Sequence, residues 1–334
     1  MPVIVVDAGG TYLRFAVADD AGTLHNYSRR RIPNSQSSFG CAFVWESIVE
    51  SIVRYVREVE NEAQTGDAIA IAVPGPVVDG CRLVAAPTIT GRYHSIPDIT
   101  GSLAAQTGRK IYLLNDVSAA AWYLGERLDA QRFFVVTVSS GIGGKLFDRR
   151  HSECVLDSAE YAGEIGHIVV DPAPDARRCD CGGRGHLGAI SSGRGTELLA
   201  RRLARSESDR FGTSVIAQTN VDPELITNEQ HLVPAALEGD RWALSVIERA
   251  ARPLAQVLSV LAASLGLDCI VVVGGFAQRL GKTYKEALCA NMSELLSARA
   301  FAAVAEDLVR VWNDGEETCL AGAAAFYQMR RAVL

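Results

Sequence analysis

Four potential metal ligands are concentrated in one short stretch of the chain. His167 is followed by Cys179-Asp180-Cys181 and then by His186, and the whole chain has only six histidines. Two thiolates and two imidazoles are an acceptable tetrahedral ligand set for Zn²⁺. The alternative is a pair of unpaired cysteines in a flexible loop with an incidental histidine. The spacing favours zinc. Because four ligands leave no vacant position, we expect a structural site that holds the loop carrying Glu164 and His167.

The chain also has two glycine-rich turns, each directly after an apolar run. Val3–Val6 is followed by Asp7-Ala8-Gly9-Gly10-Thr11, and Phe133–Val138 by Ser139-Ser140-Gly141-Ile142-Gly143. Glycines allow backbone N–H groups to approach phosphate oxygens closely, and the carboxylate of Asp7 is suited to a divalent cation. For the first turn a tight hairpin is the alternative interpretation, because paired glycines after a strand also suit a turn.

A third polar segment stands between a predicted strand, Lys110–Leu114, and a predicted helix, Ser118–Leu124. Ligand contacts in open α/β sheets usually lie at such positions. Asp116 could simply cap the helix. The other interpretation is a general base that accepts a proton from a substrate hydroxyl during phosphoryl transfer. Asn115 offers both a donor and an acceptor, which suits a polyol hydroxyl.

Strands and helices alternate around these segments. The other predicted elements are the strands Phe15–Ala18, Asp67–Val73 and Cys269–Val273 and the helices Phe39–Glu62, Arg252–Leu265 and Leu320–Met329. Such alternation predicts an α/β fold. The strand Cys269–Val273 is followed by Gly274-Gly275. Together with the two glycine-rich turns, this makes three places in separate parts of the chain where a strand is followed by glycines. They suggest two related lobes that close over one phosphate-bearing ligand.

Composition excludes several classes of protein. The chain has 334 residues, of which 48% are hydrophobic and 22% charged, as in a globular protein of two domains. The formal net charge of −6 argues against a nucleic-acid partner, and no segment approaches the roughly 20 apolar residues of a membrane span. Eight cysteines, two of them in a CxC, indicate reduced thiols and a metal site. No charged leader precedes the first strand, so we expect a cytoplasmic protein.

Taken in order, the motifs resemble the ROK family of sugar kinases and related repressors, within the acetate-and-sugar-kinase/Hsp70/actin superfamily. The segments that carry the resemblance are Asp7–Arg14, Val73–Pro76, Leu114–Ala121, Thr137–Gly144, Glu164–His167, Cys179–Gly193 and Val271–Gly275. The resemblance implies two RNase H-like lobes of the actin-like ATPase fold, an interlobe cleft and a zinc-bound loop. The smaller lobe would comprise residues 1–117 plus about 318–334, and the larger lobe residues 118–317 with the zinc loop and oligomerisation helices.

The resemblance also implies roles for individual residues. Asp116 would be the catalytic base. The acceptor-binding residues would be Asn115, Asp116, Glu164, His167, Gly80 and Thr88. Residues near the phosphates of Mg-ATP would be Asp7, Gly9, Gly10, Thr11, Ser140, Gly141 and Gly143, and those near the adenosine Gly274 and Gly275. The zinc ligands would be His167, Cys179, Cys181 and His186. The implied cofactors are therefore ATP, Mg²⁺ and structural Zn²⁺.

The implied function is an ATP-dependent carbohydrate kinase that phosphorylates the exocyclic, 6-type hydroxyl of a hexose or hexose-like substrate, as a homodimer or homotetramer. Three residues depart from the family pattern. His186 replaces a cysteine, Thr88 replaces an asparagine, and Gly188 replaces a glutamate that contacts hydroxyls near the anomeric carbon. A hydrogen bond to a charged group typically contributes about 1.5–3 kcal/mol. We therefore expect altered recognition at C1 and C2. A sugar-like C7-cyclitol of the valiolone type, or an N-acetylhexosamine, is the alternative acceptor.

A sugar-responsive regulator is the competing class of protein. The family's repressors carry an N-terminal helix-turn-helix, whereas only Met1 and Pro2 precede the first predicted strand. A sugar sensor without catalysis or DNA binding is the second alternative. The intact Asn115-Asp116 pair and both glycine-rich turns favour the kinase.

Overall fold

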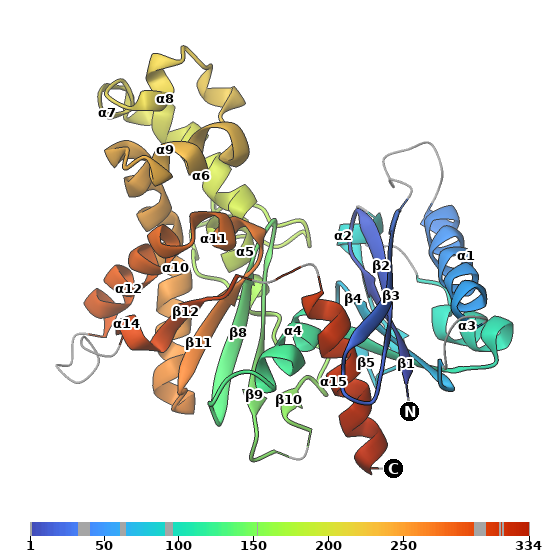
Figure 1. Cartoon of the computed structure of the whole chain (residues 1–334). Helices are drawn as coiled ribbons and strands as arrows, with labels where there is room; N and C mark the ends of the chain where they lie inside the picture. Colours follow the sequence, from blue (N-terminus) through green and yellow to red (C-terminus); the bar gives the residue numbers. More distant parts are fainter. Residues whose placement is uncertain are drawn as a thin grey trace. The chain divides into compact units, whose positions relative to one another are not determined.

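The computed structural model describes residues 2–32, 41–60, 65–90, 96–151, 153–296, 305–313, 315 and 317–333. They form two compact units (Figure 1). Unit 1 comprises residues 1–129, 151–162 and 314–334, and unit 2 residues 130–150 and 163–313. Unit 1 therefore extends beyond the expected boundary at residue 117, because helix α4 (Asp116–Gly125) belongs to it. Within this unit Ser118 Oγ donates a hydrogen bond to Asp157 Oδ2 at 2.7 Å, which ties segment 151–162 to α4.

The sheet of unit 1 has the strand order β3-β2-β1-β4-β7. Its strands are β1 (Val3–Ala8), β2 (Tyr12–Ala18), β3 (Leu24–Arg31), β4 (Ala68–Val73) and β7 (Lys110–Asn115). β1 to β3 are antiparallel, and β4 and β7 run parallel to β1. Every residue of β1 and β4 is buried, as expected for strands covered on both faces. Helices α1 (Cys41–Glu60) and α3 (Ile99–Thr107) cover one face, and α4 and α15 (Thr318–Val333) the other (Figure 1).

The C-terminal helix α15 packs directly on α4. A Cβ at Gly322 would lie 1.9 Å from the carbonyl oxygen of Ala119, so this backbone contact requires glycine. One turn earlier, Cys319 Sγ donates a hydrogen bond to the carbonyl oxygen of Asp116 at 3.8 Å. α15 therefore helps to position the start of α4, where the proposed catalytic base stands.

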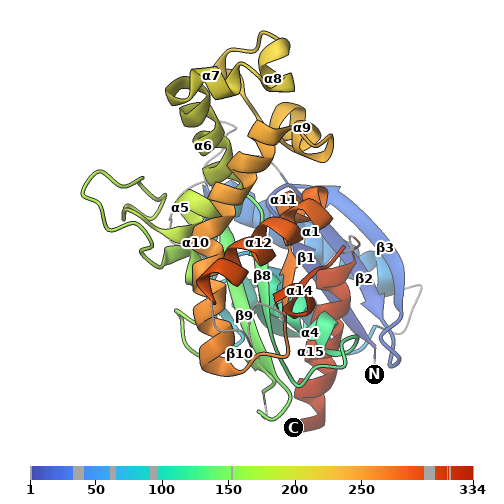
Figure 2. The ribbon, with the colours of Figure 1, turned by 90° about the vertical axis from the view of Figure 1, so that its left-hand side faces the viewer.

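The sheet of unit 2 contains, in order, β9 (Ile142–Asp148), β8 (Arg132–Val138), β11 (Cys269–Val273) and β12 (Val309–Val311). β8 and β9 form an antiparallel hairpin, and β11 runs parallel to β8. Helices α10 (Arg241–Leu265), α11 (Gly275–Leu280) and α12 (Lys282–Leu295) share a core with this sheet, and Figure 2 shows α10 running along the unit. α10 begins earlier than the predicted Arg252, because Asp240 Oδ1 caps it by accepting from Ala243 N–H at 2.8 Å.

The remaining elements are short or lie around these sheets. They are β5 (Val77–Val78), β6 (Arg82–Leu83), α2 (Pro87–Thr90), β10 (Val155–Leu156), η1 (Ile165–His167), α5 (Leu187–Ser191), α6 (Gly193–Ser206), α7 (Ser208–Phe211), α8 (Val215–Gln218), η2 (Pro223–Leu225), η3 (Asn228–Leu232), α9 (Val233–Leu237) and α14 (Ala305–Leu308). None of the described helices combines the length and apolar character needed to cross a membrane. The α/β class predicted from the alternation of elements is confirmed.

Asp148 connects the two strands of the β8–β9 hairpin at the end away from its turn. It accepts hydrogen bonds from Arg150 Nε at 3.0 Å and Arg132 Nε at 2.7 Å, and its side chain is 9% exposed. The bonds from Arg150 and Arg132 lower the pKa of Asp148 to about 2. This group therefore stabilises the fold above its unfolded-state pKa of 3.8, and the contribution is lost as the pH falls through 2.

We expect Asp148→Asn to lower the free energy of unfolding at pH 7 by about 1.5–2 kcal/mol, the contribution of a charge-assisted hydrogen bond. Urea unfolding of both proteins across a series from pH 7 to pH 3 measures the effect. The difference should begin to narrow between pH 4 and pH 3, because in that range the carboxylate is protonated in the unfolded state, whose pKa is 3.8, while it stays ionised in the folded protein. A difference that does not depend on pH would show that ionisation of Asp148 contributes nothing.

Candidate active site and metal centre

The first glycine-rich turn connects β1 to β2, so the hairpin interpretation describes its geometry. Asp7 is 7% exposed and accepts a hydrogen bond from Arg14 Nη1 at 2.8 Å, because the strand register places these residues opposite each other. Arg14 was not predicted as a site residue. The spacing of a two-strand hairpin was the signal that could have identified it. A Cβ at Gly10 would lie 2.9 Å from the carbonyl oxygen of Thr88. Thr88, which was predicted to bind the acceptor substrate, therefore packs against the turn.

Asn115, and not Asp116, caps helix α4. Its Oδ1 accepts hydrogen bonds from the N–H groups of Val117 at 2.9 Å and Ser118 at 3.3 Å, and its Nδ2 donates to the carbonyl oxygen of Gly75 at 2.9 Å. The capping alternative for Asp116 is therefore wrong. Asp116 is the first residue of the helix and is half-buried. The dipole of the helix favours a negative charge at this position.

The parallel strands bring the predicted residues of unit 1 to one edge of its sheet. Asp7 is paired with Ala72 of β4, and Val73 of β4 is paired with Asn115 of β7. Asp7 and Asn115 thus stand two strands apart, a spacing of about 10 Å. Gly80 lies at the other side of β7, where its carbonyl oxygen accepts from Leu113 N–H at 2.7 Å.

The second glycine-rich turn, from Ser139 to Gly141, connects β8 and β9 in unit 2. Among the described residues, and apart from the adjacent chain and the local helix backbone, no atom lies within 4 Å of the position that a Cβ would occupy at Gly141 or at Gly275. Gly274 packs on the end of β8, since its Cβ position is 2.8 Å from the backbone nitrogen of Val138. The strands β8 and β11 therefore bring both glycine segments to one edge of the sheet. The backbone of Gly141 and that of Gly275 therefore both border open space at this edge.

The Glu164–His167 segment packs on the same hairpin. Gly144 N–H donates to the carbonyl oxygen of Gly163 at 2.8 Å, and a Cβ at Gly166 would lie 2.1 Å from the carbonyl oxygen of Ile142. On the other side of Gly166 stands Gly188, whose Cβ position is 3.1 Å from the carbonyl oxygen of Gly166. Glycines on both sides allow this close approach, which holds Glu164 and His167 beside the second turn.

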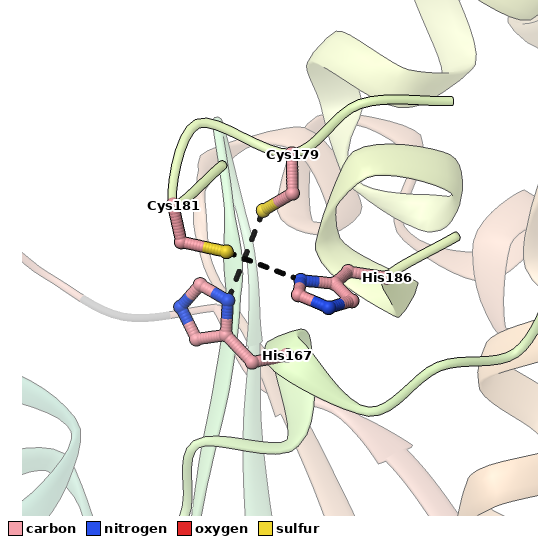
Figure 3. Close-up of side chains that lie close together, drawn as sticks. All are labelled: His167, Cys179, Cys181 and His186. Carbon is pink, nitrogen blue, oxygen red and sulfur yellow. Dashed lines mark hydrogen bonds between the residues drawn. The ribbon is translucent and has the colours of Figure 1, made fainter. Parts of the chain in front are cut away.

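The four predicted metal ligands come together in unit 2 (Figure 3). His167 Nδ1 lies 3.8 Å from Cys179 Sγ, and His186 Nδ1 lies 3.3 Å from Cys181 Sγ. All four ligand atoms are within 4.8 Å of one another. Ligand atoms of a tetrahedral zinc site with Zn–S of about 2.3 Å and Zn–N of about 2.1 Å lie roughly 3.3–3.8 Å apart. The residues therefore fit Zn²⁺ after a small contraction of the loop.

The surroundings of Cys179 and His167 affect how a metal ion would bind. Burial raises the pKa of the Cys179 thiol, so an ion would have to provide the charge that stabilises its thiolate. The other ring nitrogen of His167, Nε2, lies 3.7 Å from Glu164 Oε2. A carboxylate on the second nitrogen commonly orients a metal-binding histidine. A metal ion on Nδ1 of His167 would therefore fix the position of its ring relative to the carboxylate of Glu164.

Comparison with known proteins gives matches over almost the whole chain. The sequence model of the ROK family matches residues 3–330. The C(7)-cyclitol 7-kinase of Streptomyces hygroscopicus subsp. limoneus is 37% identical over 320 residues, which is 91% of this chain and 90% of that protein. The glucokinase of Thermotoga maritima is 28% identical over 288 residues, 84% of each chain. The crystal structure of a ROK hexokinase from Thermus thermophilus matches with a TM-score of 0.72 and 26% identity, over 99% of this chain and 100% of that chain.

Proposed function

Because the chain belongs to the ROK family, we propose that it is an ATP-dependent kinase that phosphorylates the exocyclic hydroxyl of a hexose-like ring. The observation that carries the proposal is the position of Asp116. Asp116 begins helix α4 directly after β7, at the carboxyl end of one of the parallel strands of the sheet, while Asn115 caps the helix. A carboxylate in such a position is suited to accept a proton from a bound hydroxyl.

The proposed mechanism consists mainly of positioning. Asp116 accepts the proton of the attacking hydroxyl, and the remaining N–H of Asn115 Nδ2 is available to the acceptor. Backbone N–H groups of the two glycine-rich turns hold phosphate oxygens. Asp7, which Arg14 orients, would hold Mg²⁺. When bound, Mg-ATP supplies the phosphoryl group and part of the charge neutralisation that its transfer requires.

Glu164 and His167 are proposed to bind hydroxyls of the acceptor. Zn²⁺ would be held by His167, Cys179, Cys181 and His186 and would fix the orientation of the His167 ring through Nδ1. Its role is structural, because these four ligands complete a tetrahedral shell. A homodimer or homotetramer is part of the same proposal, by analogy with the family.

Within this function, Gly188 favours a C7-cyclitol as the acceptor. A glutamate at this position would place a carboxylate beside Gly166 and the Glu164–His167 segment, and glycine removes it. Without this carboxylate, the hydroxyls that it would contact lose a hydrogen bond that contributes about 1.5–3 kcal/mol to the binding free energy. Ordinary glucose would therefore bind less well. The relative at 37% identity is a kinase of a C(7)-cyclitol. Hexoses and N-acetylhexosamines are the competing acceptors.

A coupled ADP-release assay with Mg-ATP tests both parts of the proposal. The panel contains glucose, mannose, N-acetylglucosamine, N-acetylmannosamine and valiolone-type cyclitols. We expect kcat/KM for one cyclitol to exceed that for glucose at least about tenfold. Gly188→Glu should narrow this ratio, whereas Gly188→Gln, the uncharged match, should change it less. Turnover of hexoses alone would reject the cyclitol. Binding of nucleotide and sugar without any turnover would favour the sensor.

A further inference from the structure

Arg194 connects two loops of unit 2. One is the loop that carries Cys179 and Cys181, called the metal loop below, and the other is the second glycine-rich turn, called the phosphate turn below. Arg194 lies in the first turn of α6, in unit 2. Its Nε donates a hydrogen bond to the carbonyl oxygen of Ser140 at 2.9 Å, and its Nη2 forms an ion pair with Asp180 Oδ2 at 2.6 Å. Asp180 stands between Cys179 and Cys181, two of the metal-ligating residues. One side chain therefore contacts both loops.

A second set of contacts joins the same two loops. Arg177, which precedes Cys179 in the metal loop, donates from Nη1 to the carbonyl oxygens of Ala189 at 3.1 Å and Gly195 at 2.8 Å. Between these residues, Gly193 N–H donates to the carbonyl oxygen of Ser139 at 2.8 Å. The segment from α5 to α6 is thus fixed to the metal loop on one side and to the phosphate turn on the other.

The hydrogen bond from Arg194 has a consequence for the neighbouring amide. The carbonyl of Ser140 and the N–H of Gly141 belong to one planar trans peptide group and point in opposite directions. Fixing the carbonyl oxygen of Ser140 therefore also fixes the direction of the Gly141 N–H. Gly141 is one of the residues beside which the structure leaves open space. An N–H group with a fixed direction at such a place is a suitable donor to a phosphate oxygen.

We propose that Arg194 is a positioning residue through which metal and nucleotide bind cooperatively. This inference rests on the function proposed above, because it requires the turn at Ser140 to bind nucleotide phosphate. A metal ion fixes the loop of Asp180, Asp180 holds Arg194, and Arg194 orients the Ser140–Gly141 peptide group. Coupling between two binding sites is reciprocal, so the nucleotide must raise the metal affinity by the factor by which the metal raises the nucleotide affinity.

The coupling should be modest. The side chains of Arg194 and Asp180 are 63% and 68% exposed, and exposed ion pairs are screened by solvent and salt. The expected factor is about two- to fivefold, which is the range measured for such pairs. It should decrease with increasing salt concentration.

Two measurements on the full-length protein test the proposal. Titration calorimetry gives the dissociation constant of ADP for the zinc-loaded and the chelator-treated protein, with circular dichroism as a check of folding. Transfer of zinc from the loaded protein to a chromophoric chelator, with and without ADP, gives the reciprocal effect and does not require a metal-free sample. We expect zinc to tighten ADP binding two- to fivefold, and ADP to lower the equilibrium transfer of zinc by the same factor.

Variants identify the residue responsible. Arg194→Gln and Asp180→Asn should each abolish the coupling, and the double variant should lose no more than either single one. Arg194→Lys keeps the charge but cannot donate from two nitrogens, so it should fail as well. Arg252→Gln is the matched control, because it removes another exposed ion pair of unit 2, with Glu294 Oε2 at 2.7 Å. This control should retain the coupling.

The outcomes separate this inference from the proposed function. ADP binding that is the same with and without zinc, or coupling that persists in Arg194→Gln, would overturn the role of Arg194 and leave the kinase proposal intact. A wild-type protein that binds no nucleotide in either form would overturn the proposed function and the coupling together.

Discussion

Replacement of Asp116 by Asn is expected to lower kcat by about 10²–10⁴-fold, the usual contribution of a general base. The dissociation constants of ADP and of the acceptor should change by no more than a few fold. Asn has the same shape and can still accept the hydrogen bond from Val117 N–H, which Asp116 Oδ1 accepts at 2.8 Å. The helix cap is provided by Asn115 and is retained. The ADP-release assay measures turnover, and calorimetry measures binding.

Asp98→Asn is the matched control for this prediction. Asp98 also stands at the start of a helix of unit 1, where its Oδ1 caps α3 by accepting from Gly101 N–H at 2.8 Å. Asn is an equally good cap, so kcat should stay within about twofold of the wild type. If Asp116→Asn keeps a kcat within tenfold of the wild type, Asp116 is not the base.

Loss of the metal is expected to remove stability and activity together. Metal binding to a structural site contributes directly to the free energy of folding. Cys179→Ala removes one of the four ligands, so the remaining three bind the metal ion only weakly. We expect the free energy of unfolding to fall by about 3–5 kcal/mol, which lowers Tm by roughly 10 °C for a unit of this size. Activity should fall in parallel, because His167 and Glu164 lie at this site.

Calorimetry with elemental analysis of the same sample measures this effect. Cys81→Ser is the control, since Cys81 is an exposed thiol of unit 1 outside the metal cluster, and its Tm should stay within about 1 °C of the wild type. A sample verified to be free of zinc that retains full activity and an unchanged Tm would contradict a structural role for the metal.

Two of the strands that the sequence did not reveal, β3 and β9, lack the continuous apolar run by which a buried strand is recognised. β3 (Leu24–Arg31) is a largely polar edge strand, so it has no apolar run to identify it. β9 contains Gly143 and Gly144, which have low strand propensity. Gly144 is needed there because a Cβ would lie 2.4 Å from the ring of Phe134 on the partner strand. That requirement is tertiary and cannot be recognised in the sequence of β9.

The sequence by itself identified the candidate site residues: the two glycine-rich turns, the Asn115-Asp116 pair and the four potential metal ligands. These features depend on residue type and short covalent spacing, as in Cys179-Asp180-Cys181. Only the tertiary structure decided that Asn115 caps α4, that Arg14 pairs with Asp7 and that Arg194 connects Ser140 to Asp180. The cap depends on where the helix begins, and the two arginine contacts depend on strand register and on the packing of α6. Distances between residues far apart in the chain are set by packing, which residue type alone does not specify.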